Sequence, residues 1–259
     1  MKIGLGCITH GREEYFKKVL EGIVNSMEVL DYVVIVNDGT PYSVDIPDGI
    51  EHIQLEAPLG VGHAKNIAFQ NLLDNQCDYI FLSEDDVVIK DPAVFEKYIE
   101  TSENTGMEHL IFAYPERVGI LGPSFSIDFN GILCEIHPQS PGTFCFYTAN
   151  CLKTIGLMNE RFYNAMEHVE HTYRACLAEF CPPFWAFPDI ASSHLFIENV
   201  EKEVKSTLLD RAEHQSNLEL GKRIFKDIYG HVPEDILMPT PEELQEYFDK
   251  KDSKVTTNK

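Results

Sequence analysis

Apolar, β-branched runs alternate with segments of helical spacing over residues 1–115, and this alternation constrains the fold more than any other feature. Short runs that are apolar throughout are typical of parallel strands buried on both faces, and the helices between them supply the crossovers. The predicted strands are Ile3–Ile8, Val33–Val36, Ile50–Leu55 and Tyr79–Leu82, and the predicted helices are Glu13–Ser26, Val61–Leu73 and Pro92–Thr105. The pattern therefore predicts an α/β fold with a mostly parallel, Rossmann-like central sheet flanked by helices.

The second half of the chain follows a different pattern. Between Ile111 and Tyr147, short extended runs are separated by turn signals, which predicts a small antiparallel region. Beyond it we expect three helices, over Met166–Phe180, Lys205–Tyr229 and Pro239–Lys250, and one strand, over Phe184–Phe187. We expect the tail over Asp252–Lys259 to be disordered. We expect one domain over residues 1–230 and a C-terminal helical extension with its tail over residues 231–259.

Composition excludes several classes of function. The chain has 42 acidic and 21 basic residues, a formal net charge of −21, which argues against gripping nucleic-acid backbones or anionic membranes. No apolar run approaches the roughly 20 residues that a membrane helix needs. The N-terminus enters a strand without a cleavage signal, and the seven cysteines form no Cys-x-x-Cys pair. We expect a cytoplasmic protein with free, buried thiols and no membrane span.

The strongest chemical signal is the acidic segment Glu84-Asp85-Asp86, which directly follows a predicted central strand. In open α/β sheets, ligands bind at the carboxyl ends of the strands. Consecutive carboxylates repel one another unless a cation offsets them, and hard divalent cations prefer oxygen ligands. The segment predicts a Mg²⁺ or Mn²⁺ site, and the alternative is a solvated acidic turn. His194, which follows another apolar run, is a candidate further ligand or an ordinary loop residue.

Two other segments end at the same predicted edge. Asp38, in Asn37-Asp38-Gly39-Thr40, either contacts a ligand or simply forms a turn. The stretch from Gly60 to Asn66 enters a helix, where backbone N–H groups and the Lys65 ammonium group are placed to meet a diphosphate. Two glycines before a helix are weak evidence on their own.

A helix beginning near Ala165 carries ionisable residues on one face. Glu167, Glu170, His171 and Arg174 lie within about 100° of one another at 100° per residue. One interpretation is a surface helix with a Glu170–Arg174 ion pair. The other is a general base, Glu167 or His168, at the start of the helix.

Taken together, these segments resemble the inverting glycosyltransferases of the GT-A fold, closest to family 2, over roughly residues 1–230. The resemblance is carried by five motifs in the same order: Ile8-Thr9-His10-Gly11-Arg12, Asn37-Asp38-Gly39-Thr40, Gly60 to Asn66, Glu84-Asp85-Asp86, and Glu167-His168-Val169-Glu170 with Arg174. The chain departs from the family at His168, where many members have an aspartate that acts as the base.

The resemblance implies a donor site for a nucleotide sugar, most readily a UDP-sugar. It implies that residues 1–115 form the nucleotide-sugar half and residues 116–230 the acceptor half. The implied donor-binding residues are Thr9, Arg12, Asp38, Gly60, Lys65, Asn66, Glu84 and Asp85, and the implied metal ligands for Mn²⁺ or Mg²⁺ are Asp86 and His194. Glu167 or His168 would be the base.

The acceptor stays open at this point. A glycan or glycolipid is the first expectation, and a modified base of viral DNA is a less favoured one because of the acidic charge. Two further alternatives are a sugar-nucleotide nucleotidyltransferase and a non-catalytic carbohydrate-binding relative.

Overall fold

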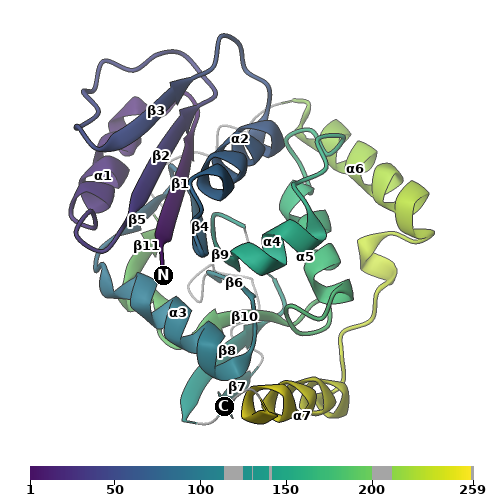
Figure 1. Ribbon diagram of the computed structural model, residues 1–259. Helices are drawn as coiled ribbons and strands as arrows, with labels where there is room; N and C mark the ends of the chain where they lie inside the picture. The colour runs from purple at the N-terminus through teal and green to yellow at the C-terminus, as the bar shows by residue number, and fades with distance from the viewer. Residues whose placement is uncertain (114–124, 130, 140–141, 200–211, 258–259) are drawn as a thin grey trace.

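A six-stranded sheet forms the centre of the molecule (Figure 1). The computed structural model describes residues 1–113, 125–129, 131–139, 142–199 and 212–257. The strand order is β3 (Ile50–Gln54), β2 (Tyr32–Asn37), β1 (Ile3–Thr9), β4 (Tyr79–Glu84), β9 (Phe144–Thr148) and β6 (His109–Ile111). The first four strands are parallel, and β9 is antiparallel to both β4 and β6. The predicted mostly parallel sheet is confirmed.

Helices cover both faces of this sheet (Figure 1). One face packs against α1 (Glu13–Val24) and α3 (Ala93–Thr105), and the other packs against α2 (Val61–Asp74), α4 (Ala149–Ile155) and α5 (Glu167–Leu177). Alternate residues of one strand enter opposite cores, as the strand period of two requires: Leu5 belongs to the first core and Ile8 to the second. Burial on both faces explains why these strands are apolar throughout.

The packing of α2 against β1 depends on two glycines. A Cβ atom at Gly6 would lie 2.9 Å from the Ala68 Cβ atom, and one at Gly4 would lie 2.6 Å from Leu72 Cδ2; Ala68 and Leu72 both belong to α2. Both distances are shorter than van der Waals contact, so the helix approaches the strand as closely as the backbone allows. Gly4 and Gly6 therefore serve this packing, and they bind no phosphate.

Two smaller sheets extend the fold on the α1 and α3 side. One has the order β10 (Phe187–Ile190), β8 (Ile132–His137) and β7 (Phe125–Phe129), and the other pairs β5 (Val87–Ile89) with β11 (Ile197–Asn199); all these pairings are antiparallel. Buried Asp189 of β10 accepts hydrogen bonds from Tyr98 Oη and Ser193 Oγ at 2.5 and 2.6 Å. The expected antiparallel region is present, although the residues 114–124 that begin it lie outside the described part.

Several predicted boundaries differ from the structure. The strand expected over Phe184–Phe187 is β10, over Phe187–Ile190, because the three preceding residues lie in turns. The helix predicted over Lys205–Tyr229 is α6 (His214–Tyr229), and residues 205–211 of that prediction lie outside the described part. A short 3₁₀ turn, η3 (Pro233–Asp235), follows it.

The expected disordered tail is wrong up to Thr257. Helix α7 spans Pro241–Thr257, and Leu244, Tyr247 and Phe248 are buried in the first core. These three apolar residues recur at helical spacing, and the Phe248 ring packs against Phe129 with a centroid distance of 5.6 Å. The helix that they anchor continues into the segment that composition alone marks as disordered.

No helix in the described part of the chain is long and apolar enough to cross a membrane. All seven cysteines are free, and six of them are buried, which confirms the expected state of the thiols. Cys176 and Cys181 lie close together, with 3.3 Å between their sulfur atoms.

The glycine packing gives a first prediction. We expect Gly6→Val to lower the free energy of unfolding by about 1–3 kcal/mol, because the added methyl groups must displace α2. The matched control is Gly62→Ala within α2, where a Cβ atom would lie 3.5 Å from the Glu167 Cβ atom, an ordinary contact. We expect the control to be neutral or stabilising by up to about 1 kcal/mol. Urea denaturation followed by circular dichroism measures both, and equal effects would contradict the packing argument.

Candidate active site

A cleft lies at the carboxyl edge of the central sheet. Its volume is about 500 Å³, including space that is open to solvent. The lining comes from the ends of β1, β2 and β4, the start of α2 and the segment before α5: Ile8, Thr9, His10, Arg12, Asp38, Pro58, Gly60, Val61, Ala64, Glu84, Asp85, Tyr163 and Asn164. A cleft of this size at the carboxyl ends of parallel strands is the expected position of a ligand site in this kind of sheet.

Asp85 is held by the loop that follows β1. It is 2% exposed, and its Oδ2 accepts hydrogen bonds from Thr9 Oγ1 at 2.7 Å and from the His10 backbone N–H at 3.0 Å. Its Oδ1 accepts a hydrogen bond from the Arg12 guanidinium group. The same guanidinium lies 3.8 Å from Asp86 Oδ2. Arg12 thus offsets the charge of two neighbouring carboxylates.

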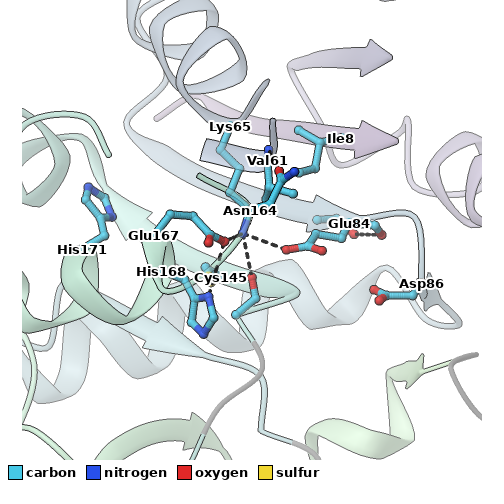
Figure 2. Close-up of polar contacts among 12 residues, drawn as sticks. Ile8, Val61, Lys65, Glu84, Asp86, Cys145, Asn164, Glu167, His168 and His171 are labelled. Atoms are coloured by element: carbon cyan, nitrogen blue, oxygen red, sulfur yellow. Dashed lines mark hydrogen bonds and ion pairs between the residues drawn. The ribbon is translucent and has the colours of Figure 1, made fainter. Parts of the chain in front are cut away.

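Lys65 offsets the third carboxylate of the acidic segment and a fourth from α5. Its side chain is fully buried, and its Nζ lies 2.7 Å from Glu84 Oε1 and 3.2 Å from Glu167 Oε1 (Figure 2). Burial alone would lower the pKa of Lys65, but the two carboxylates outweigh it and raise the pKa above the ordinary lysine value. Lys65 does not line the cleft. This placement differs from the expected contact with a diphosphate, because the ammonium group is enclosed by protein acids.

The protein therefore supplies its own cations to the acidic segment. Arg12 serves Asp85 and Asp86, and Lys65 serves Glu84. These internal ion pairs relieve part of the repulsion among the three consecutive carboxylates, which weakens the prediction of a metal from that repulsion.

The glycine loop before α2 is tied down by side chains. Asp38 accepts hydrogen bonds from the backbone N–H groups of Leu59 at 2.6 Å and Gly60 at 2.8 Å, and Asn164 Oδ1 accepts one from Val61 at 3.0 Å. The first N–H groups of this helix were expected to meet a diphosphate. Those of Gly60 and Val61 are already used within the protein, which corrects that expectation.

Asn66 also differs from its expected role. Its side chain donates hydrogen bonds to the Met158 backbone oxygen at 2.9 Å and to Glu160 Oε1 at 3.0 Å. It does not line the cleft. The residue instead fixes the segment that leads from α4 toward α5.

The two candidate bases lie at the start of α5. Glu167 is 5% exposed, and its Oε1 is 3.4 Å from His168 Nδ1 as well as near Lys65. Burial acts to raise the pKa of Glu167, but Lys65 and His168 outweigh it, so that the pKa lies well below the ordinary glutamate value. The His168 side chain is 22% exposed.

The remaining ionisable residues of α5 are structural. Glu170 is 2% exposed and is bound by Arg174 Nε at 2.9 Å and by Tyr229 Oη at 2.7 Å. Arg174 also donates to the backbone oxygens of Ile155 and Leu157. The Glu170–Arg174 pair is therefore buried and structural rather than a solvated surface pair, because it joins α5 to the end of α4 and to α6.

His194 does not join Asp86. In the antiparallel pair of β5 and β11, Asn199 lies opposite Val87, the residue that follows Asp86. His194 precedes β11 at the other end, where its backbone oxygen accepts a hydrogen bond from Lys90 Nζ and its side chain is exposed. Each strand has three residues, about 10 Å in length. The expectation that both residues ligate one metal is therefore wrong.

Seven lining residues were not among the predicted site residues: Ile8, His10, Pro58, Val61, Ala64, Tyr163 and Asn164. Tyr163 and Asn164 reach the cleft because Asn164 binds the α2 N-terminus, a contact between residues 103 positions apart in the chain. The short segment Phe162-Tyr163-Asn164 has no periodic pattern, and its position depends on how α5 packs against α2. The only local signal for this turn is the asparagine at position 164. Its φ is 53°, a conformation that asparagine adopts more readily than most residues.

Comparisons with known proteins agree with this geometry. No family model matches the sequence. A curated relative, an uncharacterized glycosyltransferase of Acanthamoeba polyphaga mimivirus, is 24% identical over 247 residues, which are 90% of this chain and 95% of the relative. Among solved structures, that of S. aureus TarS residues 1–349 in complex with UDP-GlcNAc superposes on this chain with a TM-score of 0.52 and 14% sequence identity. The superposition covers 98% of this chain and 80% of that chain.

A second TarS structure gives a TM-score of 0.50 at 18% identity, and it covers 68% of this chain and 33% of that chain. This chain thus matches only about a third of that longer TarS chain. The strand order, the cleft at the carboxyl edge and these superpositions decide the fold. The chain has the GT-A glycosyltransferase fold, and it is related to the glycosyltransferases. In this GT-A chain, the cleft occupies the end of the sheet where the acidic segment lies.

The Lys65 contacts give a second prediction. We expect Lys65→Met to lower the free energy of unfolding at neutral pH by about 3–5 kcal/mol, because it leaves the buried Glu167 and the half-buried Glu84 without their cation. The loss should shrink as the pH falls, since the carboxylates can then be protonated. Urea denaturation between pH 4 and pH 8 measures it.

The matched control is Lys97→Met, which removes an exposed ion pair with Glu100 and should cost about 0–1 kcal/mol at every pH. Adding Glu167→Gln to Lys65→Met should restore part of the stability, because it removes one of the two orphaned charges. A pH-independent loss, or no rescue, would contradict the electrostatic explanation.

Proposed function

We propose that the chain transfers a sugar from a nucleotide-sugar donor to an acceptor hydroxyl with inversion at the anomeric carbon, and that transfer needs a divalent cation. One observation carries the proposal: on a GT-A fold, the cleft is lined by three carboxylates, Asp38, Glu84 and Asp85, and by one side chain that always carries a positive charge, Arg12. Arg12 and Lys65 offset only part of the charge at this edge, because five carboxylates, those of Asp38, Glu84, Asp85, Asp86 and Glu167, stand against two cations. The excess negative charge disfavours a diphosphate unless a cation accompanies it.

The residues at the sheet edge fit a divalent cation that is shared with the donor. Asp86 is 7% exposed, and it follows β4 at the sheet edge, next to Glu84 and Asp85, which line the cleft. In the described part of the chain, no three His, Cys, Asp or Glu side chains gather into a metal-holding group. Mg²⁺ is commonly held by one or two carboxylates, with phosphate oxygens and water in the other positions. Asp86 would hold the cation, which when bound would neutralise the leaving diphosphate.

A UDP-sugar is the donor class that we propose. TarS residues 1–349 were solved with UDP-GlcNAc, and that structure covers nearly the whole of this chain. The cleft lies at the carboxyl edge of the sheet, where α/β folds bind small molecules. Of the other implied donor contacts, Thr9, Arg12, Asp38 and Gly60 all line the cleft.

For the acceptor we propose the hydroxyl of a glycan or glycolipid. The net charge of −21 is unfavourable for a DNA acceptor, because DNA contacts depend on Lys and Arg. We also propose that the protein works in the cytoplasm, which suits its seven free cysteines.

The proposed reaction is a single displacement. The acceptor oxygen attacks the anomeric carbon from the side opposite the diphosphate, and the bond between that carbon and the diphosphate oxygen breaks. Glu167 or His168 takes the proton of the attacking hydroxyl. Arg12 contributes positive charge near the leaving group, and the loop fixed by Asp38 shapes the donor side of the cleft.

Donor binding gives the third prediction. A panel of UDP-, GDP-, CMP- and TDP-sugars is tested for its effect on the melting temperature, with and without Mn²⁺. We expect a shift with a UDP-sugar only when Mn²⁺ is present. Asp86→Ala should abolish the Mn²⁺-dependent part and lower the transfer rate by about a hundredfold or more, equivalent to about 3 kcal/mol.

The matched control is Asp74→Ala, at the exposed end of α2, which should bind and transfer as the wild type does. An equal shift without Mn²⁺ would contradict the metal requirement. Binding without transfer to any acceptor would favour a non-catalytic relative, and formation of a nucleotide sugar from a nucleoside triphosphate and a sugar phosphate would favour a nucleotidyltransferase.

A further inference from the structure

We propose that His168 is the residue that accepts the proton of the acceptor hydroxyl, and that Glu167 and Lys65 hold its ring in position for this step. The inference rests on the proposed transferase activity and concerns the same site. The sequence leaves Glu167 and His168 as equal candidates, and the contacts around them separate the two.

Glu167 is poorly suited to receive a proton. Its side chain is 6% exposed, and its Oε1 already faces the Lys65 ammonium group and the His168 ring. Despite its burial, the neighbouring cation keeps its pKa well below the ordinary glutamate value. A base contributes most when its pKa is near the working pH, and a strongly depressed carboxylate contributes little.

The carboxylate of Glu167 also fixes the tautomer of His168. An ionised carboxylate only accepts hydrogen bonds, so the hydrogen between Glu167 Oε1 and His168 Nδ1 belongs to Nδ1. A neutral imidazole with its hydrogen on Nδ1 has a lone pair on Nε2. In the described part of the chain Nε2 has no hydrogen-bond partner, and the side chain is 22% exposed. Nε2 is therefore the nitrogen that can receive a proton from a substrate.

The backbone of Gly142 sets the position of the ring. A Cβ atom on Gly142 would lie 2.5 Å from His168 Cγ, and the glycine has a φ of +70°. The ring thus packs directly on the glycine, while the Gly142 oxygen accepts a hydrogen bond from Lys65 Nζ. Figure 2 shows the Lys65 ammonium group between Glu84 and Glu167, with the His168 ring beside Glu167. The buried Lys65 ammonium group therefore contacts both groups that position the ring, the Glu167 carboxylate and the Gly142 backbone.

The ionisable groups around the ring carry more negative than positive charge. The charged groups around the ring are Glu167 on α5, Lys65 on α2 and Glu84 on β4, which together carry one excess negative charge. The nearby Cys145 thiol of β9 stays neutral, because burial raises its pKa to about 12. A proton on His168 brings the cluster to a net charge of zero, and the Glu167 carboxylate directly stabilises the imidazolium.

The step balances as follows. The acceptor oxygen forms a bond to the anomeric carbon as its hydrogen passes to Nε2 of His168. The bond from that carbon to the diphosphate breaks, and its electron pair leaves with the nucleoside diphosphate. The imidazolium then returns its proton to water. Glu84 lines the cleft and binds the same Lys65 as Glu167, so two ion pairs and the Glu167–His168 hydrogen bond connect this proton acceptor to the donor site.

The test compares transfer rates and their pH dependence in four proteins: the wild type, His168→Ala, His168→Asp and Glu167→Gln. We expect His168→Ala to lower kcat by about 10²–10⁴-fold with donor binding unchanged. His168→Asp should restore part of the rate, because an aspartate carboxylate also accepts a proton, and it should change the pH dependence of kcat. Glu167→Gln should lower kcat less than His168→Ala does, because the proton acceptor remains but loses the carboxylate that orients its ring.

Each outcome decides a specific point. The control His52→Ala, on the exposed edge strand β3, should keep the wild-type rate and profile. Wild-type kcat in His168→Ala, with transfer intact, would overturn this inference alone. Absence of transfer in the wild type with every donor and acceptor would overturn the proposed function as well.

A second measurement does not depend on turnover. The ¹⁵N chemical shifts of the His168 ring at neutral pH should report the tautomer with its hydrogen on Nδ1. Glu167→Gln should change the tautomer balance while the melting curve stays cooperative. The opposite tautomer in the wild type would overturn the assignment of Nε2 as the proton acceptor.

Discussion

The buried Lys65 ammonium group is the interaction on which the site depends. A fully enclosed cation is costly unless carboxylates surround it, and here Glu84 ends a strand of the sheet while Glu167 begins a helix that packs over it. The ion pairs therefore lock α2, β4 and α5 into one arrangement. They also determine which acid at the sheet edge is available to a substrate, because an acid bound to Lys65 is a weak proton acceptor.

Much of the fold was predictable because its physical causes are local. Strands buried on both faces must be apolar throughout, so Ile3–Thr9 and Tyr32–Asn37 are evident from composition alone. The polar residues that follow each strand, such as Asp38 and Asp85, then had to meet at one edge. A cleft at this edge of the sheet was therefore predictable from the positions of the strands in the sequence.

The pairing of charges was not predictable in the same way. Lys65 and Glu167 are 102 positions apart, and no periodicity connects them. The error at His194 has the same origin, since it arose from a strand pairing, β5 with β11, that three-residue strands do not signal in a sequence. The missed cleft residues Tyr163 and Asn164 likewise depend on how two distant helices pack.

The clamp around Lys65 has a consequence for sequence change. Replacing the lysine leaves two carboxylates without their cation, whereas replacing the lysine and one glutamate together leaves only one. A substitution at position 65 should therefore be tolerated better when position 84 or 167 changes with it. The neighbouring position 168, which is bound only through a ring nitrogen and a glycine contact, contributes little to this clamp, so the constraint on it comes from the proton transfer proposed for its ring.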